Sequence, residues 1–371
     1  MFAPPLFVLE DNMSGYRLEL IGINKKFPGV QALQNVNLRV KPGSVHALVG
    51  ENGAGKSTLM KCLFGIYRPD AGKILLDGEE VQISETIDAI RQGIAMIHQE
   101  LNYIPERNIQ DNIWLGRYEK KGLVVDEKKM TEKTGELLKQ VDFDINPKII
   151  AKKLSVSQLQ AVEIAKAISY NARIIIMDEP TSSLTNSETQ HLFGLIKKLQ
   201  TEGISIVYIS HKLEEIFEVA DEVTIMRDGV NVDSWPIEEL TVPIIIGKMV
   251  GRNLDNRFPE QTVKPLDEII LKVENLSSIN PRSFQNVSFE LRKGEILGIG
   301  GLVGAQRTEM VEALFGIRSI VSGVITKHGE KIQIKNPKQS INTGLALLTE
   351  ERRITGIIPQ LTVEENILVA S

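Results

Sequence analysis

The sequence predicts an α/β fold with a largely parallel sheet, present in two copies. Three observations predict it: short β-rich runs alternate with helical patterns, a glycine-rich loop follows one of these runs, and the sequence repeats itself. The runs Ser44–Val49, Ile174–Met177 and Ser205–Ile209 are continuously apolar, which is typical of strands covered on both faces. Residues Glu188–Gln200 have the apolar spacing of a helix.

An internal repeat organises the chain. Shifting the sequence by 251 positions takes Gly50 to Gly301 and aligns two stretches without a gap. The run Leu63–Ile66 (LFGI) recurs as Leu314–Ile317, and further glycines stay in register. Glycines in register imply the same turns in both copies, not merely a similar composition. We therefore expect two copies of one module.

The repeat also predicts the domain boundaries. The first module is expected over residues 14–252, a linker containing Pro259 and Pro265 over residues 253–267, and the N-terminal part of a second module over residues 268–371. Two complete copies with this spacing would need about 500 residues. The second copy is therefore expected to be truncated at its C-terminal side.

Composition narrows the class of protein. The 371 residues are 42% hydrophobic, carry a net charge of −5 and contain one cysteine, Cys62, which fits a reducing cytoplasmic setting. No apolar run approaches the roughly 20 residues that span a bilayer. The apolar segment Met1–Leu9 has two prolines and no preceding basic residue, so a signal peptide is not expected, and Met13 is a candidate start. The negative net charge disfavours nucleic-acid binding.

The glycine-rich loop Gly50–Ser57 matches the pattern of a phosphate-binding loop between a strand and a helix. Its glycines allow backbone N–H groups to surround phosphate oxygens, and the helix that starts at Lys56 adds its positive dipole end. Lys56 would reach the β- and γ-phosphates and the Ser57 hydroxyl would bind Mg²⁺. A glycine turn with a solvated lysine is the plainer alternative. The expected ATP-binding residues are Gly50, Glu51, Asn52, Gly53, Ala54, Gly55, Lys56, Ser57 and Thr58.

Two acidic residues follow the apolar run Ile174–Met177. Asp178 at the carboxyl end of a parallel strand is well placed to bind Mg²⁺ beside the phosphate loop. Glu179 is then placed to act as the general base that polarises the attacking water. The alternative is an acidic pair that only caps the next turn.

A second helix start lies at Leu154–Leu159, where Ser155 and Gln158 form a capping box and predict a helix through Gln160–Ser169. Here the chain resembles the ATP-binding-cassette (ABC) family, whose signature at this point is Leu-Ser-Gly-Gly-Gln. Val156 and Ser157 replace the two glycines. The β-branched Val156 should hinder close approach of the backbone to phosphate, so we expect this altered signature helix to complete a poor hydrolytic site.

The resemblance assigns further residues. Gln99 matches the Q-loop, which also contacts Mg²⁺, His211 matches the switch histidine, and Phe27 falls where the family stacks an aromatic ring on adenine. Ser182–Thr185 matches the D-loop, with Thr185 in place of Asp. Taken singly, a glutamine is often a surface residue, His211 suits a helix start, and Phe27 suits a core. The resemblance implies a mostly parallel sheet core, an antiparallel β subdomain and a helical subdomain.

The second copy departs from the phosphate-loop pattern. At the same spacing, Gly55, Lys56 and Ser57 become Gln306, Arg307 and Thr308, while Gln99 becomes Glu350 and Phe27 becomes Ser278. Losing the glycine is expected to block the tight turn, and we expect weak or altered nucleotide binding; a functional variant site stays open because Thr308 keeps a hydroxyl. ABC modules work in pairs, so the intact loop would need the signature of a second module or of another copy of the chain.

Among ABC proteins, the chain resembles the ATP-binding subunits of bacterial monosaccharide importers, and most of all the galactose/methyl galactoside type. The motifs that carry this resemblance are Cys62–Tyr67, Leu154–Gln158, Ser169–Thr185, Val250–Pro259, Lys293–Arg307 and Thr349–Ile357. The ribose, xylose and arabinose subunits share most of them. The resemblance implies a sugar-transporting ATPase on the cytoplasmic face of the inner membrane, with permease subunits and, indirectly, a periplasmic sugar-binding protein as partners.

The resemblance also suggests where the permease docks. The segment Glu100–Lys153 is where the family receives a helix of the permease, and Trp114 in it could be a docking anchor or a core residue.

Two other functions stay open. One is a soluble tandem ABC ATPase acting on ribosomes or nucleic acid, which Arg307 and the short linker disfavour. The other is a non-catalytic nucleotide-binding remnant, because the second copy stops early.

Overall fold

The computed structural model describes residues 15–99, 101–251, 264–302, 304–349 and 355–369. Met13 and most of the expected linker, residues 253–263, lie outside these ranges. The chain divides into two units, residues 1–255 and 256–371. No helix within the described ranges has both the length and the apolar character needed to cross a membrane.

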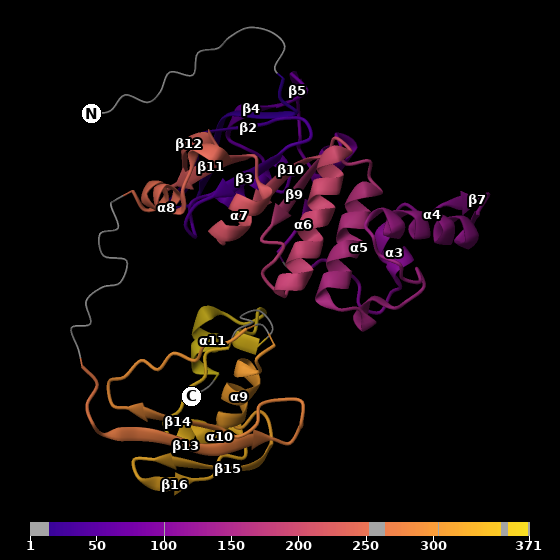
Figure 1. Cartoon of the computed structure of the whole chain (residues 1–371). Coiled ribbons are helices and arrows are strands. Elements are labelled where there is room, and N and C mark those ends of the chain that lie inside the picture. Colours follow the sequence, from indigo (N-terminus) through magenta and orange to yellow (C-terminus); the bar gives the residue numbers. More distant parts are fainter. Residues whose placement is uncertain (1–14, 100, 252–263, 303, 350–354, 370–371) are drawn as a thin grey trace. The chain divides into compact units, whose positions relative to one another are not determined.

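The first unit contains the following elements, labelled in Figure 1 where there is room. Its strands are β1 (Leu18–Phe27), β2 (Val30–Val40), β3 (Val45–Val49), β4 (Ala71–Leu76), β5 (Glu79–Val81), β6 (Ile94–Ile97), β7 (Lys120–Lys121), β8 (Val124–Val125), β9 (Ile174–Asp178), β10 (Ser205–Ile209), β11 (Glu222–Arg227) and β12 (Val230–Pro236). Its α-helices are α1 (Lys56–Leu63), α2 (Thr86–Arg91), α3 (Ile109–Trp114), α4 (Glu127–Gln140), α5 (Val156–Ile168), α6 (Asn186–Thr201), α7 (Leu213–Val219) and α8 (Val242–Val250). Two 3-10 turns span Ala151–Lys153 and Ile237–Glu239.

A six-stranded sheet in the order β12-β11-β3-β10-β9-β6 forms the centre of this unit. Its pairs are parallel from β11 to β6, and only β12 runs antiparallel. Every residue of β3 and β10 is buried. The predicted α/β fold with a largely parallel, two-faced sheet is therefore confirmed for this unit.

Two cores cover the two faces of the sheet. Val45, Ala47 and Val49 pack into one core with residues of α5 and α6, whereas Leu48 packs into the other with residues of α1. The second core also includes the inward side chains of a four-stranded antiparallel sheet, β2-β1-β4-β5. This places α1, and the loop that precedes it, between the two sheets.

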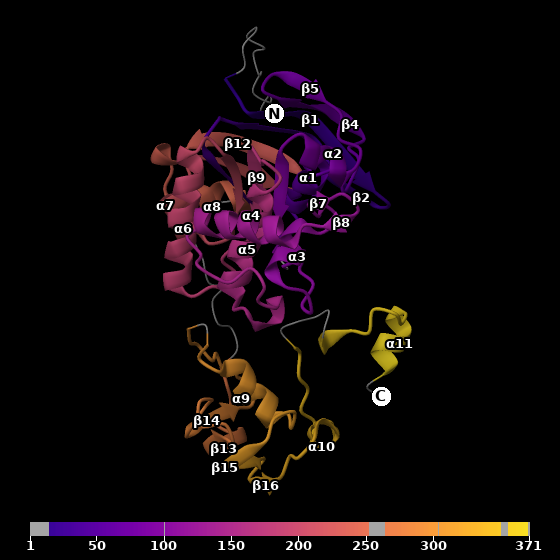
Figure 2. The same cartoon turned by 90° about the vertical axis from the view of Figure 1, so that its right-hand side faces the viewer.

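Helices α3, α4 and α5 contact one another and form a helical part of the unit, which both views show (Figure 1 and Figure 2). Trp114 in α3 is 9% exposed, packs in the core and donates from Nε1 to Thr134 Oγ1 at 2.9 Å. Of the two roles left open for Trp114, the structure supports the core residue, and the docking anchor is wrong because the ring faces inward.

The second unit repeats the antiparallel sheet and its helices. Its elements are β13 (Ile269–Ser278), β14 (Val287–Arg292), α9 (Arg307–Leu314), β15 (Ile320–Lys327), β16 (Glu330–Ile332), α10 (Pro337–Asn342) and α11 (Val363–Leu368). The strand order β14-β13-β15-β16 is that of β2-β1-β4-β5. Shifting α1 by 251 positions gives the bounds of α9, and shifting β1 gives those of β13.

The parallel sheet, by contrast, is not repeated within the described residues of the second unit. Residues 296–300 correspond to β3 but form no strand, and Ile296 is 99% exposed. In the first unit β3 is held between β10 and β11, and the described part of the second unit has no equivalent of these neighbours. An apolar run becomes a central strand only where such neighbours accept its hydrogen bonds.

Candidate functional site

The phosphate loop leaves the carboxyl end of β3 and ends at Lys56, the first residue of α1. The Lys56 side chain is buried, and its Nζ donates to the Gly50 carbonyl at 2.8 Å and the Glu51 carbonyl at 3.0 Å. Burial lowers the pKa of Lys56, while Glu179 and Asp178 act in the opposite direction. The loop is thus closed around its own lysine, with the ammonium facing two nearby carboxylates.

The glycines of this loop are required by its shape. Gly55 has φ +100, and a Cβ there would lie 2.8 Å from the Ala32 carbonyl oxygen. At Gly50 a Cβ would lie 2.3 Å from the Met226 carbonyl oxygen, which is too close for any side chain. Gly53 has φ +89 and open space beside it. A side chain at Gly50 or Gly55 would force the loop away from the neighbouring strands.

Asp178, the last residue of β9, is within reach of the start of α1. The Ser57 hydroxyl lies close enough to its carboxylate to favour the charged form. Burial and the neighbouring Glu179 raise the pKa of Asp178, and the Ser57 hydroxyl opposes them. A hydroxyl and one carboxylate are ligands that Mg²⁺ accepts when substrate phosphates and water complete its shell. The two residues fit the predicted magnesium site.

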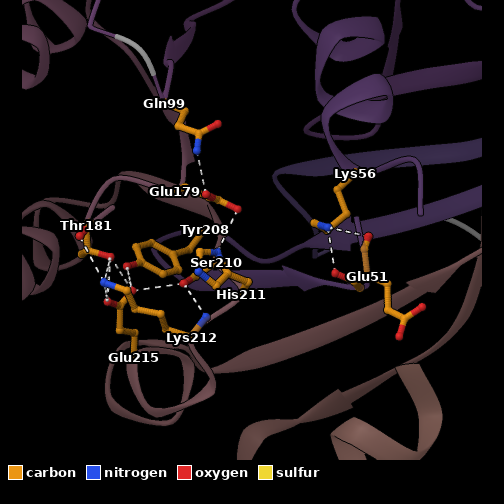
Figure 3. A network of polar contacts seen from close by, with 11 residues as sticks. Glu51, Lys56, Gln99, Glu179, Thr181, Tyr208, Ser210, His211, Lys212 and Glu215 are labelled. Carbon is orange, nitrogen blue, oxygen red and sulfur yellow. Dashed lines mark hydrogen bonds and ion pairs between the residues drawn. The ribbon is translucent and has the colours of Figure 1, made fainter. Parts of the chain in front are cut away.

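The three predicted catalytic side chains lie together, because Gln99 and His211 both contact Glu179 (Figure 3). Gln99 Nε2 donates to Glu179 Oε2 at 2.8 Å, and His211 Nδ1 lies 3.0 Å from Glu179 Oε1. His211 comes from the loop after β10, which is paired in parallel with β9. Glu179 itself has φ +48, the left-handed region that costs a residue with a side chain roughly 1–2 kcal/mol.

A cleft of about 610 Å³ joins the phosphate loop to Gln99, Asp178 and Glu179, whereas His211 is not part of its lining. Its lining contains predicted nucleotide and catalytic residues, including Asn52, Gly53, Gly55, Lys56, Ser57, Thr58, Gln99, Asp178 and Glu179. Phe27 lies in the same lining, and its ring contacts Tyr67 edge-on with centroids 5.1 Å apart. The remaining predicted loop residues are not part of the lining: the Gly50 and Glu51 carbonyls accept from Lys56, and Ala54 is buried.

The sequence gives no sign of part of the cleft wall. Val30, Gln31 and Ala32 of β2 line it, together with Asp228 and Gly229. The dipeptide Asp-Gly is a recognisable turn signal between two strands, and it does connect β11 to β12 here. Nothing local, however, indicates that this turn reaches the phosphate loop, where the Gly229 N–H donates to the Ala54 carbonyl at 3.2 Å.

The altered signature lies at the start of α5, and none of Ser155, Val156, Ser157 and Gln158 lines the cleft. The predicted capping box is confirmed: Ser155 Oγ accepts from the Gln158 N–H at 3.3 Å, and Gln158 Oε1 accepts from the Ser155 N–H at 2.9 Å. Val156 is 45% exposed. Thr185, which replaces the D-loop Asp, caps α6 through a similar box with Glu188.

In the second unit, the expectation that Gln306 blocks the turn is wrong. Gln306 takes φ +63 and caps α9 in the left-handed conformation, as Gly55 does for α1. Its side chain is held by Ser283 Oγ, which donates to Gln306 Oε1 at 2.9 Å. Arg307 and Thr308 line a separate cleft of about 690 Å³. Ser278 is buried in β13, and Glu350 lies outside the described residues.

The fold and the cleft define a nucleotide-binding cassette of ABC transporters. The ABC transporter family model matches residues 33–182. A solved nucleotide-free ATP-binding cassette from an ABC transporter has a TM-score of 0.55 at 25% identity, covering 60% of this chain and 91% of that one. The cbiO1 protein of Clostridium perfringens, part of an ABC transporter complex, also has a TM-score of 0.55 at 25% identity, covering 66% and 97%.

Curated relatives narrow the family further. The chain is 59% identical over 357 residues to the galactose/methyl galactoside import ATP-binding protein of Clostridium tetani, covering 95% of this chain and 71% of that protein. It is 55% identical over 356 residues to the protein of that name from Escherichia coli K12, covering 96% and 70%. The chain belongs to the ABC transporter family, and within it to the same group of import ATP-binding proteins as these relatives.

Proposed function

We propose that this chain is the ATP-binding and ATP-hydrolysing subunit that energises import of a monosaccharide of the galactose/methyl galactoside class through an inner-membrane permease. The observation that carries this proposal is that Gln99 and His211 both contact the Glu179 carboxylate, and that this carboxylate lines the same cleft as the phosphate loop. The sugar class is supported by the 55–59% identity to import proteins of that name.

Each side chain has a distinct role in this proposal. Lys56 binds the β- and γ-phosphates, the loop N–H groups bind the remaining phosphate oxygens, and Phe27 stacks on adenine. Glu179 accepts the proton of the attacking water. Gln99 and His211 hold the Glu179 carboxylate from both oxygens, so its position is fixed before water arrives.

Ser57 and Asp178 would hold Mg²⁺, with Gln99 nearby in the same cleft. When bound, the ion would neutralise charge that develops on the phosphate oxygens. Asp178 is suited to this because burial beside Glu179 makes its charge costly and a cation would relieve that cost.

The partners follow from the placement of the signature helix outside the cleft. A second ABC module, in this chain or another copy, would supply a signature helix to the intact loop. The two modules would close around ATP, and this closure would act on a permease. The chain would therefore be a peripheral subunit at the cytoplasmic face of the inner membrane.

Two measurements test the proposal. Steady-state ATPase activity of the full chain, alone and with the permease, should exceed that of Lys56→Ala. Uptake of labelled methyl galactoside should be restored in cells that retain the permease but lack their own import ATP-binding subunit, and Lys56→Ala should not restore it. ATPase activity no higher than that of Lys56→Ala would overturn the ATPase role, and restored uptake of ribose but not methyl galactoside would overturn the sugar class.

A further inference from the structure

Glu215 of α7 is a buried acidic residue whose carboxylate lies between the two loops that carry Glu179 and His211 (Figure 3). Its side chain is not part of the cleft lining. Four donors reach it: Thr181 Oγ1 at 2.6 Å, Tyr208 Oη at 2.9 Å, Lys212 Nζ at 3.0 Å and Ser210 Oγ at 3.1 Å.

These donors make Glu215 a strongly held anion. Burial raises the pKa of the Glu215 carboxyl, but the hydrogen bonds from Thr181, Lys212 and Tyr208 outweigh burial and keep this pKa below its ordinary value. The same arrangement raises the pKa of Tyr208, mainly through burial and then through the charge of Glu215. A buried carboxylate satisfied on both oxygens has little freedom to move, because each displacement breaks a hydrogen bond.

The donors come from both catalytic loops. Thr181 lies two residues after Glu179, and Ser210 and Lys212 flank His211 on either side. Lys212 Nζ also donates to the Thr181 carbonyl at 3.1 Å, and the Glu179 N–H donates to the Ile209 carbonyl at 2.9 Å. Glu215 therefore connects the segment after β9 to the segment after β10, because it accepts hydrogen bonds from both.

The backbone of Glu179 needs such a tie. At φ +48 it occupies a conformation that persists only where the surrounding structure fixes it. The support comes two residues after Glu179, where the Thr181 side chain donates to the carboxylate of Glu215 in α7.

We propose that Glu215 is a positioning residue, which holds the Glu179 loop against the His211 loop and so maintains the contact between these two side chains. The proposal rests on the proposed ATPase function, and it adds a residue that lies outside the cleft lining.

Glu215→Gln removes the charge but keeps the shape of the side chain. Because a displacement of about 1 Å in a catalytic group can cost about a hundred-fold in rate, kcat should fall by about 10- to 100-fold. The ATP dissociation constant should change less than about two-fold, since Lys56 and its loop do not contact Glu215. Glu214→Gln is the matched control: Glu214 is the preceding residue on α7 and is exposed.

A second pair of variants tests the other side of the contact. Thr181→Ser keeps the hydroxyl that Glu215 accepts from and should retain most of the kcat, whereas Thr181→Val should lower kcat like Glu215→Gln. Thr181→Val also provides the test if Glu215→Gln does not fold.

Backbone hydrogen exchange separates positioning from simple stabilisation. In Glu215→Gln, exchange should rise in both segments 179–182 and 210–212, with the phosphate loop and the six-stranded sheet unchanged. Exchange that rises only in α7, rises throughout the unit, or does not rise at all would overturn the proposal, as would an unchanged kcat in both Glu215→Gln and Thr181→Val. Wild-type turnover no higher than that of Lys56→Ala would instead contradict the ATPase function, and exchange would still decide the role of Glu215.

Discussion

His211 Nδ1 lies 3.0 Å from Glu179 Oε1, although the two residues are 32 positions apart in the sequence. The register of the parallel strands explains this contact, because Ile209 of β10 pairs with Asp178 of β9. Each side chain therefore follows its strand by one or two residues, and both appear at the same edge of the sheet. Sheet register brings Glu179 and His211 together, and Gln99 joins them from the end of β6.

Replacing Glu179 by Gln should separate nucleotide binding from turnover. The amide keeps the size of the side chain but cannot accept the proton of the attacking water, so kcat should fall by at least about 100-fold. ATP should still bind, because the phosphate loop is untouched. Single-turnover hydrolysis and equilibrium binding of a fluorescent ATP analogue provide the two measurements. Turnover equal to wild type would remove Glu179 from the role of base.

Lys56→Ala should have the opposite pattern and weaken ATP binding itself. It removes a buried ammonium that would bind phosphate oxygens, a charge-assisted interaction of about 1.5–3 kcal/mol, so affinity should fall by about 10- to 100-fold. Equilibrium binding of ATP measures this loss. Lys61→Ala on the same helix is the control, since Lys61 is absent from the cleft lining, and its affinity should equal that of wild type. Equal affinity in Lys56→Ala would contradict the assignment of the loop.

The sequence predicted the parts of the fold whose signal is local or repeated. The apolar strands, the glycine turn before Lys56 and the capping box at Ser155 each have a short-range cause, and the structure contains all three. The contact between Gly229 and Ala54 escaped prediction because it depends on how distant strands pair. For the same reason, residues 296–300 look like a strand in the sequence but find no neighbouring strands among the described residues of the second unit.

Gln306 and Trp114 show the limits of reading single residues. A glutamine at a glycine position was expected to block the turn, yet the hydrogen bond with Ser283 accompanies a left-handed backbone there. Trp114 was equally compatible with a surface anchor and a core position, because tryptophan suits both. Only the packing of α3 against α4 and α5 decides between them.

The buried placement of Trp114 predicts a loss of stability when its polar partner is removed. Thr134→Val should leave the indole Nε1 buried without an acceptor and cost about 1–3 kcal/mol of unfolding free energy. Thr134→Ser, which keeps the hydroxyl, should cost less. Urea unfolding followed by tryptophan fluorescence measures both. Equal stability of wild type and Thr134→Val would contradict a buried, hydrogen-bonded Trp114.

A surface ion pair near the central sheet predicts a dependence of stability on pH. Glu222, the first residue of β11, forms an ion pair with Lys41 and lies 3.6 Å from His46 Nδ1. The contact with His46 and then that with Lys41 lower the pKa of Glu222 from its ordinary 4.5 to about 2, against the effect of burial. Because the folded state holds the charged form, the stabilisation is complete above pH 4.5 and is lost as pH falls towards 2.

Glu222→Gln should therefore lower the stability of the folded chain at pH 6 and flatten its dependence on pH between 4.5 and 2. We expect a difference from wild type of about 1 kcal/mol at pH 6, because solvent screens a partly exposed pair. The difference should shrink towards zero near pH 2. Urea midpoints at pH 6, 4.5 and 3 measure this difference. Glu80→Gln is the control, since Glu80 forms an exposed ion pair with Lys73. A constant difference between Glu222→Gln and wild type at all three pH values would show that the loss comes from packing and not from the charge.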